Sequence, residues 1–228
     1  MKRFLILLIA SFFMLCACNT VGKTANRQVE KPFAPQVNAP RTSIGEVEIQ
    51  FNKMFPLPGL RQVTVNASYN TNEDAVCLQF RLDLVTYRQF WSLKGRQGFI
   101  TALANYKTDF EERNFGRGGR SALRQYGSAR GYISWQTTSL SVLARAGANV
   151  DFGYTFVDRS PYFVIRQQEA IYKDPNASGS DRTLPEFSMY FTRAQADALA
   201  ALFDEDFLET TTAQSGFSNS PSINYDEY

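Results

Sequence analysis

Apolar and polar residues alternate along three stretches in the first third of the chain. The alternation covers residues 47–51, 63–69 and 76–84. A period of two residues is typical of strands that bury one face. Turn-forming residues at 56–59 and 70–72 separate the three runs. The pattern therefore predicts three consecutive antiparallel strands.

The period changes after the third run, which predicts a helix. Thr86 and Gln89 have the spacing of a capping box, so we expect the helix to begin at Thr86. Phe99, Leu103 and Tyr106 then fall on one helical face.

The second half of the chain repeats the order of strands followed by a helix. Further strands are predicted at 132–135, 140–143, 150–156, 162–172 and 187–191. Thr192 and Gln195 form a second capping box, and Leu199, Phe203 and Phe207 make the apolar stripe of a second helix.

These elements predict an α+β fold with an antiparallel sheet of about six to seven strands and two helices on one face. The order is consistent with a ββ(β)α pseudo-repeat, which either a duplication or the frequency of capping boxes after strands would produce. The uncovered face of the sheet is the expected contact surface.

The N-terminus has the pattern of an export signal. Two basic residues precede an apolar run at residues 4–15, which is too short for a membrane span of about 20 residues. The run ends in Leu15, Cys16, Ala17 and Cys18, and this segment resembles the signals of bacterial lipoproteins. In that family a lipid is attached to the last Cys and the chain is cut before it. The alternatives are an ordinary secretory signal and an uncleaved anchor.

The resemblance implies a chain that is anchored in the cell envelope through Cys18, with the outer membrane favoured because Asn19 rather than Asp follows. We expect a signal peptide at 1–17 and a lipidated N-terminus with a flexible tether at 18–45. One α+β domain at 46–209 and a disordered tail at 210–228 would follow.

Composition excludes several classes of function. Removal of residues 1–17 takes away Lys2 and Arg3, so the formal net charge of +2 falls to zero, which argues against a nucleic-acid partner. The chain contains no His, which excludes His-dependent triads and His-ligated zinc. We expect no cofactor and no metal site. Cys77 lies in an alternating strand and is expected to be a buried free thiol.

Charge is segregated along the sequence. Residues 113–150 contain six Arg and no acidic residue, whereas the chain from Asp197 onward contains seven acidic residues and no basic one. The candidate contacts for an anionic partner are Arg113, Arg117, Arg120, Arg124 and Arg130. The alternative is that these arginines are solvated, or pack against the acidic second helix.

The sequence leaves three functional hypotheses open. The preferred one is a non-enzymatic binding domain that contacts another envelope component, with a protein as the expected partner beside the membrane itself. The second is a carrier of a small apolar ligand. The third is a carboxylate hydrolase acting on envelope glycan, since acidic clusters occur at 109–112 and 204–206.

Overall fold

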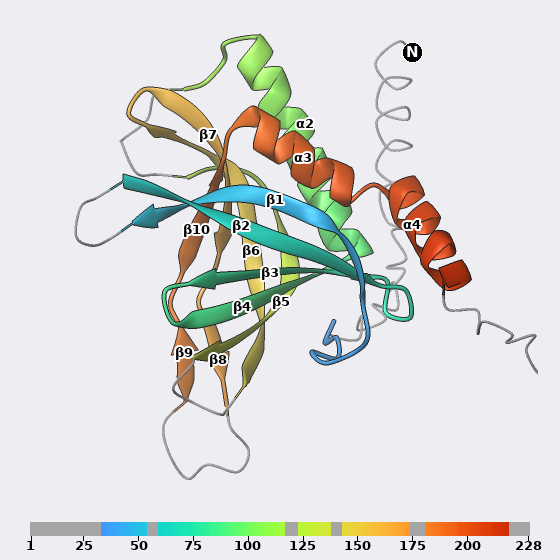
Figure 1. The fold of residues 1–228 in the computed structure, drawn as a ribbon. Coiled ribbons are helices and arrows are strands. Elements are labelled where there is room, and N and C mark those ends of the chain that lie inside the picture. Colours follow the sequence, from blue (N-terminus) through green and yellow to red (C-terminus); the bar gives the residue numbers. More distant parts are fainter. Residues whose placement is uncertain (1–32, 54–58, 117–122, 138–142, 174–180, 219–228) are drawn as a thin grey trace, which may run out of the picture. The chain divides into compact units, whose positions relative to one another are not determined.

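The computed structural model describes residues 33–53, 59–116, 123–137, 143–173 and 181–218. Within these ranges eight strands form a closed antiparallel barrel, in the order β1-β10-β7-β6-β5-β4-β3-β2 (Figure 1). The barrel strands are β1 (Thr42–Lys53), β2 (Gly59–Asn70), β3 (Ala75–Leu82), β4 (Val85–Ser92), β5 (Arg124–Thr137), β6 (Ala144–Val157), β7 (Ser160–Gln167) and β10 (Phe187–Phe191). A separate two-stranded sheet contains β8 (Ala170–Tyr172) and β9 (Arg182–Leu184).

The predicted α+β class with antiparallel strands is confirmed, but the open sheet of six to seven strands is wrong. β1 and β10 pair along their edges, with Phe51 opposite Met189, and this pairing closes the barrel. Closure buries one alternating set of side chains on every strand without a layer of helices over a whole face. The uncovered face of an open sheet, which the sequence predicted as a contact surface, is replaced by the outer surface of a closed barrel.

The prediction of a helix from Thr86 is also wrong. Residues 85–92 form β4, in which Tyr87 and Trp91 point into the barrel core. β4 pairs with both β3 and β5, and these ladders outweigh a local capping signal. The proposed pseudo-repeat fails for the same reason, because residues 84–89 are a turn and a strand whereas 190–195 end a strand and begin a helix.

Three helices occur in the described residues, where two were predicted. α2 (Leu93–Glu111) begins with Ser92, whose hydroxyl accepts a hydrogen bond from the Gly95 amide at 3.3 Å. α3 (Arg193–Leu202) has the predicted capping box of Thr192 and Gln195, which is confirmed. α4 (Glu205–Ser218) continues the chain as a separate helix, so residues 210–218 are helical and do not belong to a tail.

Two other predicted strands end differently in the structure. The run at 162–172 is divided into β7 and β8 by residues 168–169. The run at 140–143 lies almost entirely outside the described residues, and β6 begins at Ala144.

The barrel core is aromatic, and the helices pack against one end of it (Figure 1). Phe99 of α2 is fully buried, and its ring lies 5.3–6.2 Å from those of Trp91, Phe152, Phe163 and Phe203. Each fully buried Phe contributes about 1.5–3 kcal/mol relative to exposure. Trp91 and Trp135 are both buried.

The N-terminal segment (residues 33–41) packs against the outside of the barrel. Val37 forms a buried cluster with Cys77 and Phe90, and Phe33 and Tyr132 pack at its border. Cys77 is a free buried thiol, as predicted, and burial raises its pKa to about 11. The predicted tether therefore does not extend to residue 45, because residues 33–41 are packed and β1 begins at Thr42.

Candidate anion-binding face of the barrel

Of the five predicted arginines, the structure describes Arg113, Arg124 and Arg130, and Arg130 lies apart from the loop that follows α2. Arg113 follows α2 with a φ of 56°, and Arg124 begins β5. Arg130 lies six residues further along β5, which corresponds to roughly 20 Å of strand. Arg117 and Arg120 lie outside the described residues.

Arg130 instead shares the outer face of the barrel with arginines from other strands. Ser134 of β5 is paired with Arg88 of β4 on one side and with Arg145 of β6 on the other. Adjacent strands are about 4.8 Å apart, so the backbones at Arg88 and Arg145 are separated by roughly 10 Å. Arg88 donates a hydrogen bond from Nε to Oε1 of Gln79 at 2.8 Å, which holds its side chain along the surface.

Two aromatic rings lie beside these arginines on the same outer face, and two further arginines pack next to them. Phe90, Tyr132 and Gly147 lie side by side on β4, β5 and β6. The guanidinium of Arg41 lies 5.0 Å from the centre of the Phe90 ring. A Cβ at Gly147 would lie 3.2 Å from Nη2 of Arg130, so the absence of a side chain makes room for this arginine. Arg41, Arg88, Arg130 and Arg145 are called the basic face below.

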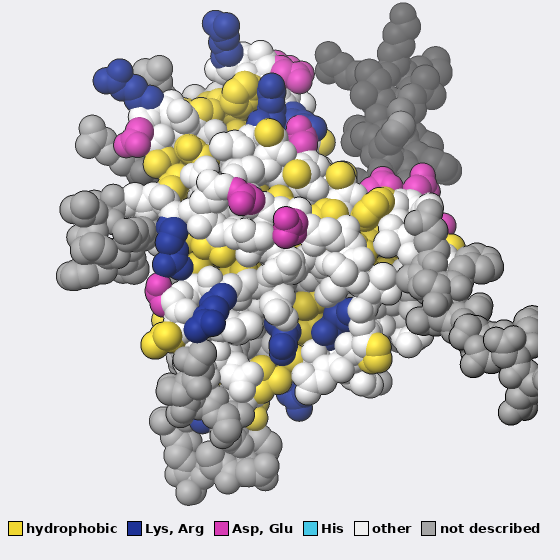
Figure 2. All heavy atoms as spheres, viewed as in Figure 1, with side chains coloured by type: hydrophobic (Ala, Val, Ile, Leu, Met, Phe, Trp, Pro, Cys, Tyr) yellow, Lys and Arg dark blue, Asp and Glu magenta, His cyan; other side chains and the backbone are white. Residues whose placement is uncertain are grey.

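The four arginines of the basic face have no carboxylate partner among the described residues. Figure 2 shows basic side chains over the lower part of the barrel and acidic side chains over β1, while the region of the helices at the top carries side chains of both signs. At Tyr132 burial raises the pKa, and the charge of Arg145 opposes this rise. Guanidinium groups without carboxylates are suited to phosphate or carboxylate groups of a partner, because their planar donors bind such oxygens in pairs.

Of the basic face, the sequence pointed to Arg130 as a candidate contact but not to Arg41, Arg88 or Arg145. Arg41 fell in the predicted tether and Arg88 in the predicted helix. The sequence offers no local signal for grouping them, because they meet through the pairing register of β4 and the packing of residues 33–41.

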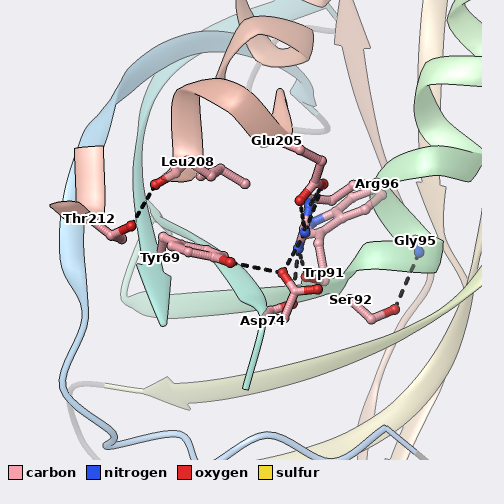
Figure 3. A network of polar contacts seen from close by, with 9 residues as sticks. All are labelled: Tyr69, Asp74, Trp91, Ser92, Gly95, Arg96, Glu205, Leu208 and Thr212. Carbon is pink, nitrogen blue, oxygen red and sulfur yellow. Dashed lines mark hydrogen bonds and ion pairs between the residues drawn. The ribbon is translucent and has the colours of Figure 1, made fainter. Parts of the chain in front are cut away.

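A second arginine site differs from the basic face, because its arginine is buried and paired with carboxylates (Figure 3). Arg96 of α2 is 1% exposed, and its Nη2 lies 2.6 Å from Oδ1 of Asp74 and 2.9 Å from Oε1 of Glu205. Its Nη1 donates to the carbonyl oxygens of Asp74 and Trp91. Tyr69 donates to Oδ1 of Asp74 at 3.0 Å, and burial together with this hydrogen bond raises the pKa of Tyr69 to about 12.

This Arg96 cluster (Tyr69, Asp74, Arg96 and Glu205) joins the β2–β3 turn, α2 and the start of α4. All three guanidinium nitrogens of Arg96 donate hydrogen bonds within these contacts, which points to a structural role for the cluster. Glu205 of the acidic C-terminal region pairs with Arg96, which lies outside the arginine-rich stretch of residues 113–150.

The two acidic clusters lie at opposite ends of α2. Asp109 accepts a hydrogen bond from Tyr126 at 2.6 Å, and Glu205 binds Arg96, which is thirteen residues earlier in the same helix. Thirteen helical residues span about 20 Å, more than the roughly 5–10 Å that separates a pair of glycosidase carboxylates. Among the described residues there is also no group of three or more His, Cys, Asp or Glu side chains able to hold a metal ion.

One polar contact crosses the barrel interior. Gln89 of β4 donates from Nε2 to Oε1 of Gln167 of β7 at 2.8 Å, although β5 and β6 lie between these strands in the sheet. Oε1 of Gln89 and Nε1 of Trp91 are buried and have no hydrogen-bond partner in the described part of the chain. Such atoms mark places where a water molecule or a ligand group would be stabilised.

Together these features define a class of protein, an eight-stranded antiparallel barrel with helices at one end and a basic outer face. The chain belongs to a family described as an uncharacterised Treponema protein, whose model matches residues 20–210. No curated protein and no solved structure matches the chain significantly. Among the helices in the described ranges, none combines the length and the apolar character needed to cross a membrane.

Proposed function

We propose that the chain is a lipid-anchored protein of the bacterial cell envelope that binds an anionic envelope component through the basic face and performs no catalysis. The observation that carries this proposal is the set of four guanidinium groups around Phe90 and Tyr132 without a carboxylate partner among the described residues. In an ordinary solvated surface, arginines of this density are interspersed with acidic residues.

The anchor is proposed at Cys18, with the outer membrane as the favoured location. The signal-like residues before Cys18 support this part of the proposal. Labelling cells with a tagged fatty acid tests it, because the label should appear on the wild-type chain and be lost in Cys18→Ser. If neither the wild type nor Cys18→Ser carries the label, the proposed anchor is wrong.

Cross-linking in cells tests the binding role of the basic face. The test variant carries Arg88→Gln, Arg130→Gln and Arg145→Gln, which removes three charges and keeps side chains of similar length. The cross-linked material is recovered through a tag on the chain, and its protein and non-protein components are identified by mass spectrometry.

A matched control removes three charges elsewhere. Arg113, Arg124 and Arg159 are exposed and lie after α2, at the start of β5 and in the β6–β7 turn. Their replacement by Gln changes the net charge equally but leaves the basic face intact. One envelope component should be recovered with the wild type and the control and lost with the test variant. Equal recovery with all three chains would contradict the proposal.

The second candidate function is a carrier of a small apolar ligand inside the barrel. The observation that favours it is a pair of buried atoms, Gln89 Oε1 and Trp91 Nε1, that have no hydrogen-bond partner among the described residues. Eight-stranded barrels either fill their interior with side chains or hold one small ligand. Native mass spectrometry of the chain purified from its membrane tests this function. A bound molecule that is lost in Gln89→Leu would support a carrier, and an unliganded mass would count against it.

A further inference from the structure

We infer that the anionic component is the phospholipid surface of the membrane that carries the anchor, and that the basic face lies against its headgroups. This inference rests on the proposed function and names the chemistry of the partner. Three observations support it: the place where the chain enters the barrel, the chemistry of the face, and the charge on the opposite side of the barrel.

The chain enters the described structure beside the basic face. Phe33 packs at the border of the cluster formed by Val37, Cys77 and Phe90, and Tyr132 packs at the same cluster. If Cys18 is in the membrane, only the fourteen residues 19–32 separate it from this point of the barrel. Such a short connection keeps the basic face within reach of the membrane surface at a high effective concentration.

The side chains of the face suit a headgroup layer. Arginines bind phosphate oxygens through paired N–H donors, and each cation near an anionic leaflet adds to membrane binding. Tyr132, half-buried at the centre of the group, is of the type enriched at membrane interfaces, where an apolar ring carries a polar hydroxyl. Because three of the four arginines lie on paired strands, their spacing is fixed before binding.

The opposite side of the barrel carries negative charge. β1 lies four strands from β5 in the barrel order, and its residues Glu46 and Glu48 are exposed on the outer face, since Val47 and Ile49 point into the core. An anionic surface would therefore attract one side of the barrel and repel the other. This asymmetry would orient the anchored protein, with β1 and β10 directed away from the membrane.

Binding to lipid vesicles tests the inference without the lipid anchor. The protein is the mature chain from residue 18 onward with Cys18→Ser, so that only the folded surface is available. The vesicles consist of phosphatidylcholine alone or of phosphatidylcholine mixed with phosphatidylglycerol, and binding is measured by co-sedimentation at low and physiological salt. The Arg88, Arg130 and Arg145 test variant and the Arg113, Arg124 and Arg159 control are compared with it, after circular dichroism has shown that each is folded.

The chain should bind the phosphatidylglycerol vesicles and not the neutral ones, and binding should weaken as salt rises. The test variant should bind about 100-fold more weakly, and the control no more than about threefold more weakly. Equal binding to both kinds of vesicle, no binding to either, or equal loss in the test variant and the control would overturn the inference. If vesicle binding fails while cross-linking in cells recovers an acidic protein through the basic face, the proposed function stands and the lipid partner is wrong.

Discussion

Arginine occurs in two contrasting environments in this protein. Arg96 is buried and lies between the carboxylates of Asp74 and Glu205. Arg130 and Arg145 are exposed on the outer face of the barrel and meet no carboxylate of the described residues. The same side chain therefore joins elements through carboxylates in one region, whereas in the other its contacts are with neutral groups, such as the Asn149 side chain beside Arg130.

The contrast separates a structural role from a binding role. A buried guanidinium requires partners, because leaving a charge unpaired in the interior costs several kcal/mol. The exposed guanidinium groups of Arg130 and Arg145 are hydrated and have no such requirement, so they are retained without a large cost in desolvation. Changes at the Arg96 cluster should therefore reduce stability, and changes at the basic face should reduce binding.

The largest effect is expected when Arg96 loses both carboxylates. Asp74→Asn with Glu205→Gln leaves the buried charge without a counterion and should lower the free energy of unfolding by about 3 kcal/mol. Urea denaturation followed by circular dichroism measures it. The control is the exposed ion pair of Arg61 and Asp83, where Asp83→Asn should cost less than about 1 kcal/mol. Equal losses in the two variants would contradict a structural role for Arg96.

A smaller loss is expected from Tyr69→Phe, which removes the hydrogen bond to Asp74 and keeps the ring beside Arg96. The free energy of unfolding should fall by about 1–2 kcal/mol at neutral pH. Since the folded pKa of Tyr69 is raised from 10.0 to about 12, its contribution is full below pH 10 and is lost as the pH rises through 12.

Urea midpoints measured from pH 8 upward test this pH dependence. The difference between wild type and Tyr69→Phe should shrink between pH 10 and 12. A difference that stays constant over this range would show that Tyr69 does not titrate with the Arg96 cluster.

Substitutions in the basic face should hardly change the stability of the protein. The variant with Arg88→Gln, Arg130→Gln and Arg145→Gln should change the free energy of unfolding by less than about 1 kcal/mol, because exposed charges contribute little. Thermal unfolding measures this, beside the vesicle assay on the same preparation. A large loss of stability would show that these arginines stabilise the fold, as Arg96 does.

The smallest effect is expected at Gly147. In Gly147→Ala the new Cβ would meet Nη2 of Arg130, and the flexible guanidinium would move aside. Stability should stay within about 1 kcal/mol of the wild type, and vesicle binding should fall by about twofold. Gly127→Ala is the control, since a Cβ there meets nothing within 4 Å and should leave binding unchanged. No difference between the two variants would show that the position of Arg130 is unimportant.

Local signals predicted a substantial part of the fold. The alternating runs became β1, β2 and β3, and the capping box of Thr192 and Gln195 begins α3. The same type of signal failed at Thr86 and Gln89, because Gln89 is fully buried in β4 and bonds to Gln167 instead of capping a helix. A capping box begins a helix only where the backbone groups of the segment are not already hydrogen-bonded to neighbouring strands, as those of β4 are to β3 and β5.

The sequence alone determined which stretches alternate, that His chemistry is excluded, and that Cys77 would be a buried thiol, since these depend on residue type and near neighbours. Only the tertiary structure decided that the sheet closes, that Arg96 pairs with Asp74 and Glu205, and that Arg41 and Arg88 join Arg130 and Arg145. Glu205 lies 109 residues from Arg96, and the basic face draws on residues 33–41, β4, β5 and β6. Contacts over such separations depend on strand register and packing, which no local pattern in the sequence encodes.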